Sequence, residues 1–240
     1  LNATFREAIK KDIIKSNPME FVEKPKSSKP KEEVRALTIE EEQKLIAALK
    51  EKPTLYGDQL LLMMFTGMRM GEVNALEVGD VNVKKCTISV RQTITKDRFD
   101  NAIVGKMTKT YAGMRTLHVS KAVISLLLRC IGDKKSGPIF LRNGKLISTA
   151  KVNNKFTRFV EIHDIIDPTV RGKVDTHSLR HSFATRCIEG GMDAFALMKI
   201  LGHKDINVTI NTYCSAFDEY KQKNMALAEE YMAQQNLRLT

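Results

Sequence analysis

Apolar side chains recur every three to four residues over most of the chain, which indicates amphipathic helices. Residues that can cap a helix stand at several of the expected starts, and glycines follow several of the expected ends. The predicted helices cover residues 1–15, 38–50, 57–65, 120–130, 149–163, 177–188, 193–200, 206–212 and 217–235. Because the segment 57–65 is almost wholly apolar, we expect it to lie in the core.

Alternating and β-branched residues mark three short segments between the predicted helices 57–65 and 120–130. These segments are residues 86–95, 106–110 and 115–119. Polar and glycine residues separate them, so we predict that they form one three-stranded antiparallel sheet. The expected fold class is mainly α, of the α+β type, with a small antiparallel sheet.

The first 35 residues differ in composition from the rest. Residues 1–20 contain a single helix, which cannot form a core alone, so we expect it to be the last helix of a preceding domain. Residues 21–35 are rich in Lys, Pro and Ser and predict an extended basic linker. Residues 36–240 are long enough to form one domain with its own core and a C-terminal helix.

Charge points to a polyanionic partner. Lys and Arg number 39 against 28 acidic residues, which gives a net charge of +11 and an isoelectric point near 9.5. No run approaches the ~20 apolar residues of a membrane span, and residues 1–11 lack the pattern of a signal peptide. Four widely spaced cysteines are expected to be free thiols in a reducing compartment. We therefore expect a cytosolic protein with a polyanionic partner.

Candidate chemistry gathers in residues 176–213, which contain His177, Arg180, His203 and Tyr213. Arginine presents a fork of donors that matches phosphate oxygens, histidine transfers protons near neutral pH, and tyrosine can act as a covalent nucleophile. Singly, each of these residues is more often a packed or surface side chain. Together they indicate attack on a phosphate ester, a scheme that needs no metal or other cofactor.

Two other readings of this stretch are open. Cys214 follows Tyr213 directly and is a rival nucleophile, although its simpler reading is a small buried residue. His177 and His181 have the i, i+4 spacing of a zinc-binding helix, but Ser178 stands where a metalloprotease has glutamate.

Three further charged residues lie at expected turns. Arg69 follows the buried helix 57–65, and Glu72, one turn later, is placed to orient its guanidinium. Both residues could equally form a surface ion pair. Lys109 stands near a hairpin tip, where lysine is usually solvated but could reach into a phosphate site as a proton donor.

At these residues the sequence resembles the tyrosine recombinases of the phage integrase type. The matching motifs are residues 66–72 (TGMRMGE), 176–185 (THSLRHSFAT), 201–203 (LGH) and 211–213 (NTY). The resemblance covers roughly residues 36–225 and looks nearest to the integrases of conjugative transposons. It implies a helical catalytic domain in which Tyr213 attacks the scissile phosphodiester to form a 3′-phosphotyrosyl bond. Arg69 and Arg180 would then hold the non-bridging oxygens.

The resemblance also implies the remaining roles. Lys109 would protonate the leaving 5′-oxygen, His177 would assist proton transfer, and His203 would hydrogen-bond the phosphate. Lys106 is the alternative general acid, because it also lies near the hairpin tip. The first 20 residues would be the last helix of a core-binding domain, most of which the sequence lacks.

The implied function is that of a DNA breaking-rejoining enzyme, a site-specific recombinase that integrates and excises a mobile element by transposition. The expected partner is double-stranded DNA. A homo-oligomer is expected on DNA, held together through the last predicted helix, which begins at Phe217 and ends at Gln235. Two alternatives are a type IB topoisomerase, which would use the same groups, and a DNA-binding architectural protein with a recombinase shape.

Overall fold

The computed structural model describes residues 2–22, 33–106, 114–235 and 237. The chain divides into two compact units, Leu1–Glu33 and Val34–Thr240. The first contains one helix, α1 (Asn2–Lys10), which is shorter than predicted because Asp12 adopts a left-handed backbone conformation with φ 53°. Every described helix is too short or too polar to span a membrane.

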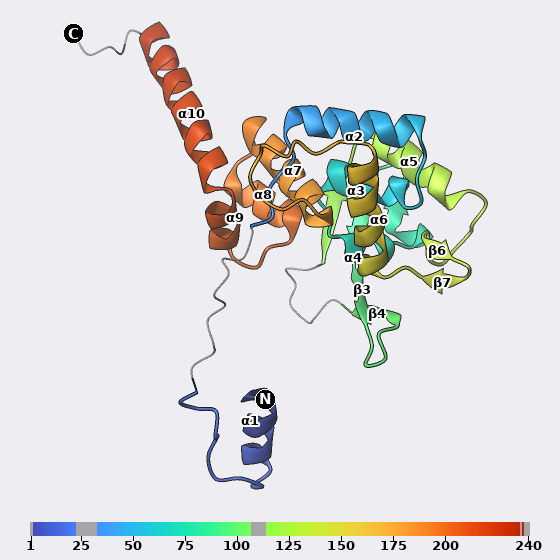
Figure 1. Ribbon diagram of the computed structural model, residues 1–240. Helices are drawn as coiled ribbons and strands as arrows, with labels where there is room; N and C mark the ends of the chain where they lie inside the picture. The colour runs from blue at the N-terminus through green and yellow to red at the C-terminus, as the bar shows by residue number, and fades with distance from the viewer. Residues whose placement is uncertain (1, 23–32, 107–113, 236, 238–240) are drawn as a thin grey trace. The chain divides into compact units, whose positions relative to one another are not determined.

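The second unit is mainly helical, as predicted (Figure 1). Its α-helices are α2 (Ile39–Glu51), α3 (Gly57–Thr66), α4 (Met70–Asn74), α5 (Lys121–Ile131), α6 (Thr149–Ile162), α7 (Thr176–Glu189), α8 (Ala194–Leu201), α9 (Ile206–Thr212) and α10 (Cys214–Gln234). The sequence pattern did not predict the short α4 or the 3-10 helix η1 (Val78–Asp80). In Figure 1, α10 extends away from the other helices of this unit.

Local capping explains most of the helix starts. Thr38 and Glu41 form a capping box at α2, in which each side chain accepts from the other residue's backbone amide. Ser120 and Asp193 accept from amides in the first turns of α5 and α8. Asp175 caps α7 by accepting from the His177 amide, so this helix begins one residue earlier than predicted.

The strands group differently from the prediction. The segment 86–95 forms two strands, β2 (Thr87–Val90) and β3 (Gln92–Lys96), which belong to different sheets. One sheet has the order β1-β2-β5, with the unpredicted β1 (Val81–Asn82) and with β5 (Arg115–His118) antiparallel to β2. β3 pairs with β4 (Ala102–Lys106) in a separate hairpin, and β6 (Leu141–Arg142) pairs with β7 (Lys145–Leu146).

The chain leaves the β1-β2-β5 sheet at Arg91. Side-chain hydrogen bonds and an ion pair hold the start of β3 against residues 75–80 instead. The Gln92 amide donates to Ala75 O at 3.0 Å and to Glu77 Oε1 at 3.0 Å. Arg91 pairs with the buried carboxylate of Asp80. The prediction of one continuous strand was wrong at this point, because the spacing of apolar residues does not report which partner a strand has.

Two apolar clusters form the core of the second unit. The larger one includes α3, which packs against α4, α5 and α7 and is buried as predicted. The smaller one joins α7, α8 and the start of α10. Its buried members are Ala184, Ile188, Leu197, Leu201, Tyr213 and Phe217. Buried residues of α7, α8 and α10 therefore pack in one cluster with Tyr213.

Candidate active site

Arg180 of α7 is almost wholly buried, with 5 % exposure. Its Nη1 donates to Gly67 O at 2.7 Å, and its Nη2 donates to Leu201 O at 2.7 Å. These carbonyls lie at the C-terminal ends of α3 and α8, where helix carbonyls lack partners within the helix and carry partial negative charge. Burial, and then the charge of Arg69, lower the pKa of Arg180 to about 9, so its guanidinium remains charged at neutral pH.

Glycine at position 67 makes this arrangement possible. Gly67 ends α3 with φ 64°, and a Cβ there would lie 2.3 Å from Phe183 Cδ1 of α7. Any other residue would strain the backbone and push α3 away from α7. The glycine thus keeps its own carbonyl within reach of Arg180.

Arg69 stands directly before α4 and is the more open of the two predicted arginines, with 40 % of its side chain exposed. Its Nη1 donates to Glu72 Oε1 at 2.9 Å and lies 3.5 Å from Leu201 O. Its backbone amide donates to Glu72 Oε2 at 2.9 Å. Arg69 and Arg180 therefore meet at a single carbonyl, that of Leu201.

Glu72 orients Arg69, and a residue that sequence reasoning did not select holds Glu72. Both Nη atoms of Arg115 donate to the Glu72 carboxylate, at 3.1 and 2.7 Å. Burial acts to raise the pKa of Glu72, but the hydrogen bonds and charge of Arg115, followed by those of Arg69, outweigh it and lower the pKa. The carboxylate is therefore ionised at neutral pH although its side chain is only 1 % exposed.

His203 joins the same cluster just after the end of α8. Its Nε2 lies 3.0 Å from Arg180 Nη2, and its Nδ1 lies 2.8 Å from Thr209 Oγ1. A guanidinium has no acceptor, so Nε2 must accept and Nδ1 must carry the proton that it donates to Thr209. Burial, and then the charges of Arg180 and Arg69, lower the pKa of His203 to about 4, so this imidazole is neutral.

Tyr213 lies between α9 and α10 with 5 % exposure. Burial raises the pKa of its phenol to about 12, while the positive charges of Arg180 and Arg69 act in the opposite direction. The His181 ring packs against it with a centroid separation of 5.6 Å. Tyr213 is therefore a protonated phenol at neutral pH, within the field of the arginine pair.

The other predicted site residues are placed less closely. His177 lies in the first turn of α7 with a side chain 66 % exposed, and its Nδ1 is 3.7 Å from Asp175 Oδ1. Lys109 lies outside the described residues. The backbone of Lys106 ends β4, where it pairs with Gln92. The structure thus brings Arg69, Glu72, Arg180, His203 and Tyr213 together.

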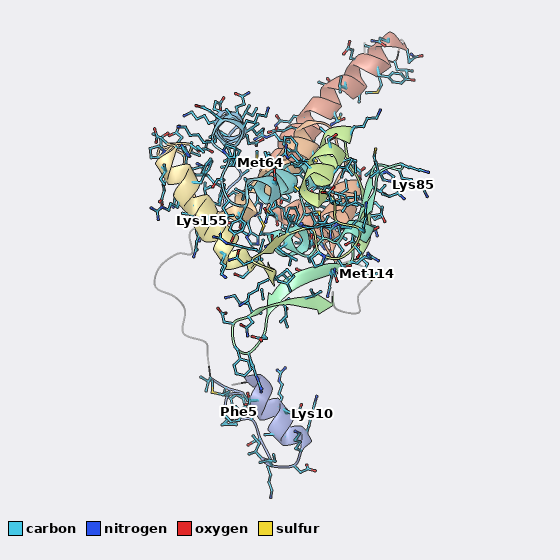
Figure 2. All side chains as sticks on the ribbon, turned by 90° about the vertical axis from the view of Figure 1, so that its right-hand side faces the viewer. Phe5, Lys10, Met64, Lys85, Met114 and Lys155 are labelled. Carbon is cyan, nitrogen blue, oxygen red and sulfur yellow. The ribbon has the colours of Figure 1, made fainter. Side chains whose placement is uncertain are left out.

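Sequence reasoning missed two supporting residues, Arg115 and Thr209. Arg115 begins a strand, and Thr209 lies inside α9, where it is fully buried. Neither residue could be selected from its neighbours in the sequence. Arg115 contacts Glu72, which is 43 positions away, and Thr209 contacts His203, which is 6 positions away. A hollow of about 270 Å³ opens beside these groups and is lined by Arg115, His203 and Lys204 among others. Met114, labelled in Figure 2, lies on its rim directly before β5.

A second hollow, of about 410 Å³, is strongly basic. Its lining includes Arg142, Lys151, Lys155 and Arg158. The last three stand on α6 and form its basic face, and Lys155 is labelled on this helix in Figure 2. The hollow also includes Tyr56, whose hydroxyl accepts from Arg142 Nη1 at 3.3 Å. Such a surface suits a polyanion.

Comparison with known proteins identifies the family of this fold. The profile described as the phage integrase family matches residues 35–219, which contain every group of the candidate site. The chain belongs to the phage integrase family.

Among curated members of the family, the transposase from transposon Tn916 of Enterococcus faecalis is 25 % identical over 248 residues. That alignment covers 96 % of this chain and 61 % of the relative. The tyrosine recombinase XerC of Chlamydia trachomatis serovar L2 is 27 % identical over 208 residues, covering 85 % of this chain and 61 % of that protein. The chain thus spans about three fifths of the length of these relatives.

Solved structures of the family share the fold. The Tn1549 transposon integrase in complex with transposon right end DNA superposes with a TM-score of 0.73 at 24 % identity, over 95 % of this chain and 76 % of that one. A lambda integrase dimer bound to a core site superposes with a TM-score of 0.57 at 20 % identity, over 88 % and 56 %. The mainly helical domain with small antiparallel sheets is therefore the fold of this family.

Proposed function

We propose that this protein is a site-specific DNA recombinase, which cleaves and rejoins DNA strands through a 3′-phosphotyrosyl intermediate to move a genetic element. The observation that carries the proposal is the meeting of Arg69, Arg180 and His203 at the end of α8, with Tyr213 in the field of both guanidinium groups. The transposase and XerC among its relatives support the same reading.

In this proposal Tyr213 attacks the scissile phosphorus, and Arg69 and Arg180 donate to the non-bridging oxygens. The charge that develops on those oxygens meets guanidinium groups already held in place, which is the arrangement that stabilises a transition state most effectively. The phenol loses its proton during the attack, because its pKa of about 12 keeps it protonated beforehand. The phosphotyrosyl bond retains the energy of the broken phosphodiester, so rejoining needs no ATP.

His203 would donate to a phosphate oxygen through Nε2, which in the DNA-free protein accepts from Arg180. The hydrogen of Arg180 Nη2 that faces His203 would instead donate to the phosphate, while the bond to Leu201 O is kept, and the imidazole proton would shift from Nδ1 to Nε2. Thr209 permits this shift, because its hydroxyl can accept from Nδ1–H or donate to bare Nδ1. The buried threonine thus keeps the imidazole oriented in both proton arrangements.

The leaving 5′-oxygen needs a proton, which we assign to Lys109, with Lys106 as the alternative. We assign the assisting role to His177; its position one turn before Arg180 on the same face of α7 and its exposure to solvent support this assignment. We assign the basic face of α6 to the backbone of double-stranded DNA. We assign residues 1–20 to a preceding core-binding domain, with 21–35 as its linker to the catalytic domain.

We further propose that α10 holds a second copy of the chain on DNA. Phe217 is buried in the smaller apolar cluster, so the first turns of α10 pack against helices of the same chain. Farther along, Met225, Leu227 and Tyr231 are 59 to 64 % exposed, which leaves apolar surface for a partner. Deleting residues 225–240 should preserve cleavage of a single site and abolish strand exchange between two sites.

The test of the proposal is covalent capture of DNA. A library of nicked duplexes with randomised sequence around the nick is incubated with the protein, and adducts that resist denaturant are isolated and sequenced. Wild-type protein should form adducts on a defined sequence, because loss of the short nicked fragment prevents rejoining. Tyr213→Phe should bind the same DNA and form no adduct.

Cys214→Ser is the matched control, since it removes the neighbouring rival nucleophile. This variant should form adduct at the wild-type rate. Adduct in Tyr213→Phe, or its loss in Cys214→Ser alone, would show that Tyr213 is not the nucleophile. Relaxation of supercoiled DNA without a preferred sequence, and without exchange between two sites, would favour the topoisomerase alternative.

A further inference from the structure

Arg115 links the two arginines of the candidate active site to the strand β5. Its side chain is 7 % exposed, and its guanidinium reaches two other elements. Both Nη atoms donate to Glu72 of α4, and Nε donates to Ile200 O of α8 at 2.6 Å. We infer that Arg115 is a positioning residue for DNA strand cleavage. It holds the guanidinium groups of Arg69 and Arg180 in a fixed arrangement relative to each other. This inference rests on the proposed function.

The first part of the argument concerns the carboxylate of Glu72. Its two oxygens accept four hydrogen bonds, two from Arg69 and two from Arg115. A carboxylate that is held on one side by a buried fork has little freedom to rotate. Glu72 can therefore orient Arg69, which is 40 % exposed and would otherwise sample several rotamers.

The second part concerns the end of α8. Arg115 Nε bonds to Ile200 O, and the next carbonyl, Leu201 O, accepts from Arg180 and lies within 3.5 Å of Arg69 Nη1. Ile200 O and Leu201 O belong to consecutive peptide planes that meet at the Leu201 Cα, and the helical dihedral angles of Leu201 couple their orientations. Arg115 thus holds both the carboxylate that orients Arg69 and the helix end at which the two arginines meet.

The third part concerns charge. Glu72 alone would offset the positive charge of Arg69, whereas Arg69, Arg115 and Arg180 together with this one carboxylate carry a net charge of +2 at neutral pH. The charge of Arg115 acts on both Arg180 and His203, where it contributes to the lowered pKa values. A positive surplus is what a phosphate with developing negative charge requires.

The test compares variants with wild type on a nicked duplex selected by adduct formation, with protein in excess so that a single turnover is observed. Arg115→Met should lower the rate of adduct formation about 10- to 100-fold, as expected for loss of a residue that orients a reacting group. DNA affinity should change less than twofold, because Arg115 is buried and is assigned no contact with DNA.

Two further variants separate positioning from charge and from stability. Arg115→Lys keeps the charge but cannot span Glu72 and Ile200 O together, so it should remain slow. Arg35→Met is the matched control: Arg35 makes the same two-bond pair with buried Glu41, at 2.7 Å and 2.7 Å, among residues assigned no catalytic role. It should lower the melting temperature and leave the rate within twofold of wild type.

Each outcome bears on the inference. Wild-type rates in folded Arg115→Met, full rates in Arg115→Lys, or equal slowing by Arg35→Met would overturn it. If Arg115→Met does not fold, the rate of Arg115→Lys decides the question in the same way. Absence of adduct in wild-type protein would instead refute the proposed function, so the two failures are distinguishable.

Discussion

Arg180 and Arg115 are both buried, but their charges are balanced in different ways, and replacing each with methionine should affect folding differently. Arg180 bonds to two backbone carbonyls and the imidazole of His203. Arg115 forms a two-bond ion pair with the carboxylate of Glu72. We predict that Arg180→Met lowers the free energy of unfolding little or not at all and that Arg115→Met lowers it strongly.

The magnitudes follow from the environment of each guanidinium. Burial, and then the charge of Arg69, lower the pKa of Arg180 from 12.5 to about 9, which corresponds to about 5 kcal/mol of unfavourable interaction with the charged form. Methionine would relieve that cost but leave the Gly67 and Leu201 carbonyls without their donor, at ~1–3 kcal/mol each. The two effects oppose each other, so we expect a net change between ~1 kcal/mol of destabilisation and ~3 kcal/mol of stabilisation. For Arg115→Met, a buried carboxylate loses its main partner, at ~3–5 kcal/mol.

Urea unfolding followed by circular dichroism measures both changes, provided that the slopes with denaturant agree among the variants. Adduct formation by Arg180→Met should also fall ~100-fold or more, because one preorganised donor to the phosphate is gone. A destabilisation of Arg180→Met equal to that of Arg115→Met would refute the reasoning about its burial. Cleavage at the wild-type rate would refute its assignment to the phosphate.

Three other predictions concern the imidazole, its support and the basic face of α6. Because the pKa of His203 is lowered from 6.5 to about 4, NMR should detect no protonation of its imidazole between pH 8 and pH 5.5. The unfolded chain binds this proton more tightly, so the free energy of unfolding should fall as the pH drops from about 6.5 toward 4. A midpoint near 6.5 would contradict this. Thr209→Val should slow single-turnover cleavage about tenfold while Thr209→Ser does not, and equal rates would show that the hydroxyl is dispensable. Replacing Lys151, Lys155 and Arg158 with glutamine should reduce the salt dependence of DNA binding by ~0.9 in the logarithmic slope for each phosphate that the protein no longer neutralises, and an unchanged slope would place DNA elsewhere.

Local features of the fold could be predicted because their causes lie within a few residues. The capping box of Thr38 and Glu41 spans three positions, and the cap of Ser120 on α5 spans three as well. The apolar run of α3 could only be buried in a chain of this composition. The pairing of the strands was harder to predict, because the residue pattern of one strand does not identify the strand that it pairs with. Residues 86–95 in fact contribute to two different sheets.

The sequence by itself determined the helices and the order in which Arg69, Arg180, His203 and Tyr213 occur, because helix periodicity and motif spacing are properties of neighbouring residues. Only the tertiary structure decided that Arg69 and Arg180 meet at Leu201 O, that Arg115 holds Glu72, and that Thr209 orients His203. The reason is physical: a buried charge requires partners. The packing of α3, α8 and β5 around α7 and α4, rather than the local chain, determines which carbonyls and carboxylates are within reach.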